Sequence, residues 1–230
     1  MKNKTNIWIL CSGRTGSSYL CEILNNSGLY PHIFERYNGG PGLRDFDNVH
    51  VNVKMIHYQW MCCHFKLKDV LLKFPDTKFI HLMRRDKLHQ SISCIIANTC
   101  STWRIYEDNI EYYRKIIENN IGKVKIENVI HKYIEYCLAD DFWSDKIKKL
   151  NLDYIEVYYE DIFSSKDKIL EILDFCDLDS SNFINNKLNI KLLKSSDVFK
   201  KYYDSIKNHK LLKNEKLITE YYQYCKKKDT

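Results

Sequence analysis

The chain of 230 residues is 44% hydrophobic and 29% charged, with a formal net charge of +6 at pH 7. This balance is typical of one globular domain and excludes a disordered chain. No apolar run is long enough to span a membrane, and no basic stripe with interleaved aromatic residues indicates binding of nucleic acid.

Predicted strands and helices alternate along the chain. Short apolar runs predict strands at residues 6–10, 49–55, 78–83 and 153–158. Helical periodicity predicts helices at residues 18–26, 58–73, 87–98, 105–120, 125–149, 166–176, 198–207 and 214–226. We therefore predict a P-loop-like α/β fold, in which helices flank a parallel sheet, as a single domain over residues 1–230 with a helical C-terminal part. A helical insertion at residues 104–150 is the alternative organisation.

A turn of small residues with the sequence CSGRTGSS, residues 11–18, joins the first predicted strand to a helix. Phosphate binding requires close approach of the backbone, converging N–H donors and positive charge, and glycines before a helix start supply the first two. We therefore predict a phosphate-binding loop composed of Ser12, Gly13, Arg14, Thr15, Gly16, Ser17 and Ser18. A tight turn capped by serine is the alternative interpretation.

Two other loop chemistries do not fit these residues. The loop of a nucleoside triphosphatase carries a lysine before its hydroxyl residue, and this loop has none. A cysteine phosphatase needs Cys, five residues and Arg, and Ser17 stands where the arginine would be. No predicted strand ends in an obvious acidic ligand for Mg²⁺.

The cysteine pattern predicts a reducing environment. Nine cysteines are present, an odd number, and no C-x-x-C pair occurs, so the spacing for zinc is missing. Residues 1–6 are polar, so we expect no signal peptide. These features predict a cytoplasmic protein without a metal.

A second candidate phosphate site follows the strand predicted at residues 78–83. The segment RRDKLHQSIS places two arginines at the strand end, and Ser93 lies eight positions after Arg85. Arg85 and Ser93 are predicted to converge on one phosphate, with the arginine making the stronger contact. In the alternative, Arg84 and Arg85 lie on the surface and Asp86 caps the next helix.

Together the two motifs resemble the sulfotransferases that use 3′-phosphoadenosine-5′-phosphosulfate (PAPS). CSGRTGSSYLCEIL resembles their 5′-phosphosulfate loop, and RRDKLHQSIS resembles their 3′-phosphate segment. The closest resemblance is to the trehalose 2-sulfotransferase-like bacterial group, through PHIFERY, VNVKM, YEDI and KLLKSSD in the same order. The resemblance spans most of residues 5–205 and implies the sulfotransferase fold, with PAPS as donor and 3′,5′-bisphosphoadenosine (PAP) as product.

The resemblance also implies roles for individual residues. Arg14 takes the basic position of the 5′ loop and acts as a fixed positive charge, while Arg85 and Ser93 hold the 3′-phosphate. Glu35 aligns with the glutamate proposed as general base in the trehalose-type enzymes. Lys194 is a further candidate for contact with the 3′-phosphate.

Other candidates come from their positions beside the predicted strands. His57 follows the second strand and is the reserve candidate for the general base, although a lone histidine is more often structural. Lys54 ends that strand and is expected to face the acceptor or the sulfonate, with a solvated strand end as the alternative. Trp60 and Trp103 are candidates for lining the substrate pocket, with burial in the core as the alternative for each.

We therefore predict transfer of a sulfuryl group from PAPS to a hydroxyl of a carbohydrate or glycolipid. A small molecule or a protein tyrosine is an alternative acceptor. Two functions of other classes compete: a non-catalytic module that binds PAP or PAPS, and a P-loop nucleotide kinase. No nucleic-acid partner is expected, and a homodimer is left open.

Overall fold

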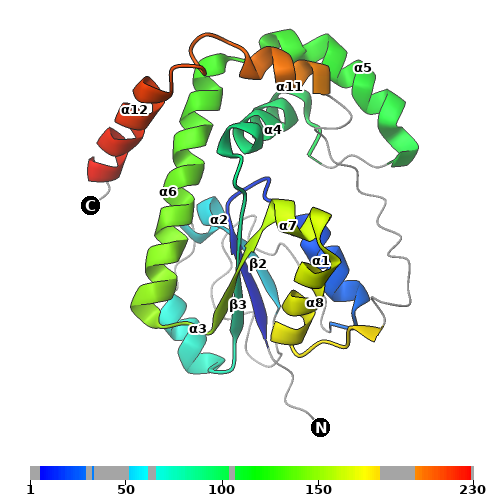
Figure 1. Ribbon diagram of the computed structural model, residues 1–230, viewed down its shortest axis with the longest axis vertical. Helices are drawn as coiled ribbons and strands as arrows, with labels where there is room; N and C mark the ends of the chain where they lie inside the picture. The colour runs from blue at the N-terminus through cyan, green and yellow to red at the C-terminus, as the bar shows by residue number, and fades with distance from the viewer. Residues whose placement is uncertain are drawn as a thin grey trace. The chain divides into compact units, whose positions relative to one another are not determined.

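Figure 1 shows the fold in a computed structural model, which describes residues 6–29, 33, 52–61, 66–103, 107–181 and 200–228. The chain divides into two compact units. Unit 1 comprises Met1–Arg85 and Ala139–Asn189, and unit 2 comprises Asp86–Leu138 and Ile190–Thr230. The organisation as a single domain stays a prediction.

A four-stranded parallel sheet forms the centre of unit 1. Its strands are β1 (Ile7–Cys11), β2 (Val53–Ile56), β3 (Lys78–Met83) and β4 (Tyr154–Tyr158), in the order β2-β1-β3-β4. The chain leaves β1 toward β2 on one side and then returns to place β3 on the other side of β1. Ligands of open α/β sheets bind at such a switch point, outside the carboxyl ends of the strands. A ligand site is therefore expected at the segments that follow β1 and β3.

Helices cover both faces of this sheet. Alternate side chains of the strands, with Trp8, Leu10 and Phe79 among them, pack against α3 (Leu67–Lys73) and the C-terminal half of α6 (Ile126–Leu150). On the other side of the sheet lie α1 (Ser17–Asn26) and α8 (Lys166–Phe175), as Figure 1 shows. The predicted α/β fold with a parallel sheet between helices is confirmed.

Unit 2 is helical in the part of it that the structure describes. Its apolar core joins residues of α4 (Lys87–Cys100), α5 (Ile110–Asn120), the N-terminal half of α6 and α11 (Lys200–Lys207). Two 3₁₀ turns, η2 (Glu107–Asn109) and η3 (Ile121–Lys123), flank α5, and α12 (Glu215–Lys228) follows α11. The prediction of a helical C-terminal part is confirmed by α11 and α12.

Most predicted elements are present with shifted ends, one predicted helix was wrong and one short helix was not predicted. The helix predicted at residues 58–73 is two helices, α2 (His57–Met61) and α3. Residues 62–65 lie outside the described part, and Lys66 has an extended backbone directly before α3. A short helix, α7 (Tyr159–Ser164), follows β4 directly and was not predicted. Because α7 is so short, no helical period is visible in its sequence.

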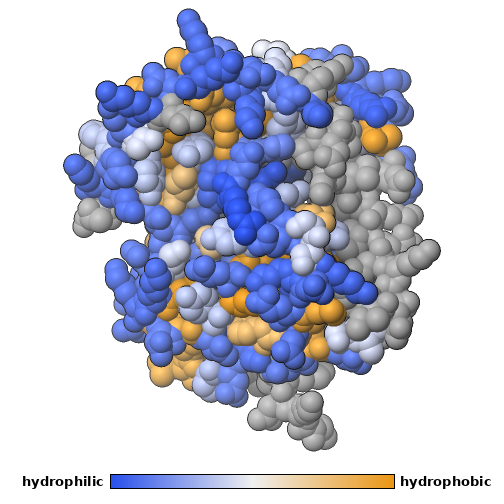
Figure 2. Space-filling view, viewed as in Figure 1, coloured by the Kyte–Doolittle hydropathy of each residue, from blue (hydrophilic) through white to orange (hydrophobic). Residues whose placement is uncertain are grey.

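Polar side chains dominate the face of the protein shown in Figure 2, with hydrophobic residues in small groups. Within the described residues, no helix combines the length and the apolar character that crossing a membrane requires. The largest fully buried side chains include Trp8 and Trp143. Both lie in the core of unit 1.

Candidate active site

The loop between β1 and α1 has the backbone of an anion-binding turn. Arg14 and Gly16 both adopt left-handed conformations, with φ angles of 62° and 77°. Gly16 is the N-cap of α1 and, being glycine, provides no side-chain cap. The first N–H groups of a helix have no intrahelical acceptor, and they form the positive end of the helix dipole. An anion bound at the start of α1 would accept hydrogen bonds from these donors.

Hydrogen bonds inside unit 1 fix the start of this loop, at Cys11 and Ser12. The hydroxyl of Thr15, which is fully buried, donates to the carbonyl oxygen of Ser12 at 3.1 Å. The hydroxyl of Ser12 donates to Oδ1 of Asp140 on α6 at 3.2 Å. One turn further along α6, Nε1 of Trp143 donates to the carbonyl oxygen of Cys11 at 3.3 Å. The hydroxyls of Ser12 and Thr15 thus shape the loop itself.

Lys54 brings a buried positive charge to the start of α1. Its side chain is only 4% exposed, and Nζ donates to Oγ of Ser18 at 3.5 Å. Val53 and Met55 face α3 and α6, so the alternation of β2 turns Lys54 to the opposite face, where α1 lies. The solvated strand end that was the alternative for Lys54 is therefore wrong.

Arg84 reaches the same loop from the end of β3. The residue is 8% exposed, and its Nη1 donates to the carbonyl oxygen of Arg14 at 3.4 Å. Its guanidinium lies 4.3 Å from the ring centre of Tyr159, and its Nε lies 3.9 Å from Oε1 of Glu160. Arg84 is thus part of the loop's surroundings, and its placement on the surface in the alternative interpretation is wrong.

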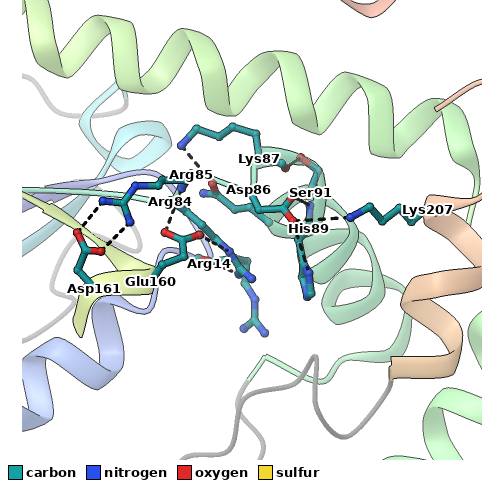
Figure 3. A network of polar contacts seen from close by, with 11 residues as sticks. Arg14, Arg84, Arg85, Asp86, Lys87, His89, Ser91, Glu160, Asp161 and Lys207 are labelled. Atoms are coloured by element: carbon teal, nitrogen blue, oxygen red, sulfur yellow. Dashed lines mark hydrogen bonds and ion pairs between the residues drawn. The ribbon is translucent and has the colours of Figure 1, made fainter. Parts of the chain in front are cut away.

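Arg85 points in a different direction from Arg84. Its Nη1 and Nη2 donate to the two carboxylate oxygens of Asp161, each at 2.7 Å. The guanidinium lies 4.2 Å from the ring centre of Tyr158, and the side chain is 52% exposed. This hydrogen-bonded pair raises the pKa of Arg85 and lowers the pKa of Asp161. Figure 3 shows Arg85 turned toward Asp161, while Arg14, Arg84 and Glu160 lie together.

α7 packs behind the loop and the first turn of α1. A Cβ atom added to Gly16 would lie 2.4 Å from Cδ2 of Tyr159, so the ring stands directly against the glycine. Phe163 stacks on Tyr19 of α1 with ring centres 4.2 Å apart, and it contacts Tyr159 at 4.6 Å. Burial and the nearby Glu22 raise the pKa of Tyr19. Glycine at position 16 is thus required by both its φ angle and its neighbour.

Two further predicted site residues, the base candidate His57 and the pocket candidate Trp60, lie in unit 1. His57 begins α2 at the carboxyl end of β2, with its ring centre 4.9 Å from that of Phe142 and 6.4 Å from that of Trp143. Trp60 contacts the ring of Trp143 at 5.5 Å and is partly buried against the core. Cys11, which ends β1, is paired with Ile56, the residue before His57, so His57 lies at the edge of the sheet from which the loop emerges.

The remaining predicted residues lie elsewhere. Ser93 is buried on α4 in unit 2, so its convergence with Arg85 on one phosphate stays a prediction. Trp103 is 50% exposed, and the alternative that buried it in the core is wrong. Glu35 and Lys194 lie outside the described residues. The predicted cap is present, since Oδ1 of Asp86 accepts a hydrogen bond from the backbone N–H of His89 at 2.8 Å.

Sequence reasoning missed Asp140 and underrated Arg84 and Tyr159. Strand alternation was a usable signal for Arg84, since it continues the phase of Ile80 and Leu82 on the face opposite Phe79. Asp140 lies within a long helix far from the loop in sequence, and no local pattern marks it.

A parallel sheet whose first strand leads through a glycine turn into a bare helix start is typical of α/β proteins that bind phosphate groups. Residues 64–203, which are 140 of the 230 residues, match the family model described as Stf0 sulphotransferase. The chain therefore belongs to the Stf0 sulphotransferase family, as the resemblance predicted, and this membership supports transfer of a sulfuryl group as its activity. No curated protein and no solved structure matches the chain significantly.

Proposed function

We propose that the chain transfers a sulfuryl group from PAPS to a hydroxyl of a carbohydrate or glycolipid. The family match begins at residue 64, so the geometry of the loop at residues 12–18 supports the proposal separately from the match. The carrying observation is that the buried ammonium of Lys54 lies at the uncapped, positive end of α1. A buried lysine next to a helix N-terminus attracts an anion strongly, because both features are positive and little water screens them.

The loop is suited to the 5′-phosphosulfate end of the donor. The N–H groups of the first turn of α1 and the ammonium of Lys54 supply donors and charge at the helix start, and Arg14 adds a positive side chain to the loop itself. Negative charge develops on the leaving oxygen as the S–O bond breaks, and preorganised positive groups stabilise it. Arg14 acts here as a fixed positive charge, whereas the ammonium of Lys54 can also donate a hydrogen bond to the leaving oxygen.

The bidentate pair of Arg85 and Asp161 supports a second anion site. A carboxylate that accepts from both guanidinium nitrogens occupies the geometry in which arginine binds phosphate. We propose that the 3′-phosphate of the donor replaces Asp161 at Arg85, with Ser93 and Lys194 as further ligands. The exposure of the Arg85 side chain is in keeping with such an exchange.

The acceptor hydroxyl loses its proton during attack, and we propose Glu35 as the general base with His57 as the reserve candidate. His57 lies at the carboxyl end of β2, on the same edge of the sheet as the loop. General-base assistance is worth about 10²–10⁴-fold in rate. Trp60 and Trp103 remain candidates for packing against a sugar ring.

A transfer assay with ³⁵S-labelled PAPS over sugars, glycolipids and phenols tests the proposed reaction. Labelled product with a sugar or glycolipid supports the proposal, and product with phenols alone would correct the acceptor. Glu35→Gln and His57→Gln are compared in the same assay. The true base is identified by a loss of at least about tenfold in kcat with PAP affinity unchanged.

Ligand binding separates the two competing functions. PAP should raise the melting temperature of the wild-type protein, and Lys54→Met should weaken this shift because the buried charge is gone. Stabilisation by ATP–Mg²⁺ but not by PAP would instead favour a nucleotide kinase. Binding of PAP without transfer to any acceptor of the panel would favour a non-catalytic module.

A further inference from the structure

The side chain of Arg84 contacts a backbone atom of the loop, the carbonyl oxygen of Arg14. Nη1 of Arg84 donates to the carbonyl oxygen of Arg14, a residue in the left-handed region. That region is uncommon for residues other than glycine, and such conformations persist where the surroundings hold them. C=O and N–H point in opposite directions across a trans peptide, so this hydrogen bond also fixes the direction of the Thr15 N–H.

Two neighbours on α7 keep the guanidinium of Arg84 in place. Tyr159 lies against its face at 4.3 Å from the ring centre, and Oε1 of Glu160 lies 3.9 Å from Nε. The same Tyr159 ring stands against Gly16, the second left-handed residue of the loop. Arg84 therefore contacts one left-handed residue of the loop, Arg14, and Tyr159 contacts the other, Gly16.

The neighbouring arginine makes none of these contacts among the described residues. Arg85 is bound by Asp161 and Tyr158, and only its backbone N–H reaches Glu160, at 3.1 Å. Arg84 directly follows β3 and continues its alternation, whereas the chain bends at Arg85, so the two side chains point in different directions. The two arginines are therefore not interchangeable, although they are adjacent in sequence and identical in chemistry.

We propose that Arg84 is a positioning residue, which holds the loop at residues 12–16 in its anion-binding shape through the carbonyl of Arg14 and the ring of Tyr159. Arg85 is left free of this role to serve as a direct ligand. The inference rests on the proposed function only for the identity of the ligand, PAP, that is used to test it.

Lysine at position 84 keeps the charge but cannot lie flat on Tyr159 while donating to the carbonyl of Arg14. We expect Arg84→Lys to weaken PAP binding by about tenfold or more, the scale of one hydrogen bond made by a charged group. The KM for PAPS should rise while the KM for the acceptor stays unchanged. In hydrogen exchange measured without ligand, the amides of Thr15 and Gly16 should exchange faster, while those of β1 and β3 keep their protection.

Three comparisons distinguish positioning from a general loss of stability. Arg85→Lys should weaken PAP binding without changing exchange in the loop. Arg114→Lys, on the exposed surface of α5 beside Glu111, is the matched control and should change neither. Tyr159→Phe keeps the ring and should keep loop exchange slower than in Tyr159→Leu, which should reproduce the faster loop exchange of Arg84→Lys.

The outcomes separate the two proposals. If Arg84→Lys leaves loop exchange and PAP affinity at wild-type values, or if exchange rises throughout the sheet to the same extent, the positioning role is refuted. If the wild-type protein does not bind PAP, the donor proposal fails, and loop exchange in the Arg84 and Tyr159 variants still decides the role of Arg84. If Arg84→Lys does not fold, Tyr159→Leu against Tyr159→Phe carries the test.

Discussion

Alanine at position 16 is expected to be costly for two separable reasons. The φ angle of 77° lies in the left-handed region, where a side chain costs about 1–2 kcal/mol. The new Cβ would also lie 2.4 Å and 2.9 Å from two ring atoms of Tyr159. That ring cannot move aside freely, because Arg84 and Phe163 pack against it. Forced overpacking of this kind costs a further ~1–3 kcal/mol.

The sum is about 2–5 kcal/mol of unfolding free energy, which corresponds to a fall in melting temperature of about 4–20 °C at this chain length. Gly28→Ala is the matched control, since Gly28 has a φ angle of 89° and its added Cβ would meet no atom within 4 Å. It should therefore show only the backbone cost, about 1–2 kcal/mol.

Chemical denaturation of both variants, and of Gly16→Ala combined with Tyr159→Ala, provides the measurement. In the double mutant the clash is absent, so the two substitutions should couple favourably by about 1–3 kcal/mol. If Gly16→Ala costs no more than Gly28→Ala and shows no coupling to position 159, the ring does not stand against the glycine and the reasoning about α7 fails.

Three further predictions concern single groups. Ser12→Ala removes a hydrogen bond to the buried carboxylate of Asp140 and should lower the free energy of unfolding in urea by about 1–3 kcal/mol. An unchanged urea midpoint would show that Ser12 does not anchor the loop. Arg85 lowers the pKa of Asp161, so their pair contributes stability above the ordinary carboxyl pKa of about 4 and loses it as pH falls. The urea midpoints of wild type and Asp161→Asn should therefore converge in acid, and a difference that stays constant with pH would contradict the pair. Burial raises the pKa of Cys176 to about 12, so the stability it contributes is complete below the ordinary thiol pKa and is lost as pH rises toward 12. Wild type should therefore lose stability between about pH 9 and 10.5 more steeply than Cys176→Ala, by at most ~1.4 kcal/mol per pH unit, and equal slopes would refute the raised pKa.

The sheet was predictable because its strands are short apolar runs between clear breaks. The strand predicted at residues 78–83 agrees with β3 at both ends, and the helix that follows it begins at Lys87 as predicted. Asp86 gives that helix a recognisable cap, so the local sequence and the structure agree. The helix predicted at residues 58–73 was wrong because its apolar spacing continues between two separate short helices.

The surroundings of the loop were harder to predict, because they depend on contacts between distant segments. Nothing local indicates that Asp140 meets Ser12, or that Tyr159 meets Gly16. α7 has no side-chain hydrogen bond at its N-cap, and the packing of Phe163 on Tyr19 supports it from outside. The difference between Arg84 and Arg85 was within reach, since strand alternation separates adjacent side chains.

Residues 158–161, the corner where β4 meets α7, divide their side-chain contacts between the two arginines. The side chains of Tyr158 and Asp161 contact the guanidinium of Arg85, whereas those of Tyr159 and Glu160 lie at the guanidinium of Arg84. Glu160 also accepts a hydrogen bond from the backbone N–H of Arg85. An insertion or deletion of one residue here would move at least one of these side chains away from its arginine, even if every amino acid type were kept. The length of this segment is therefore constrained as well as its composition, and a one-residue insertion between Tyr158 and Asp161 should disturb the contacts of both arginines.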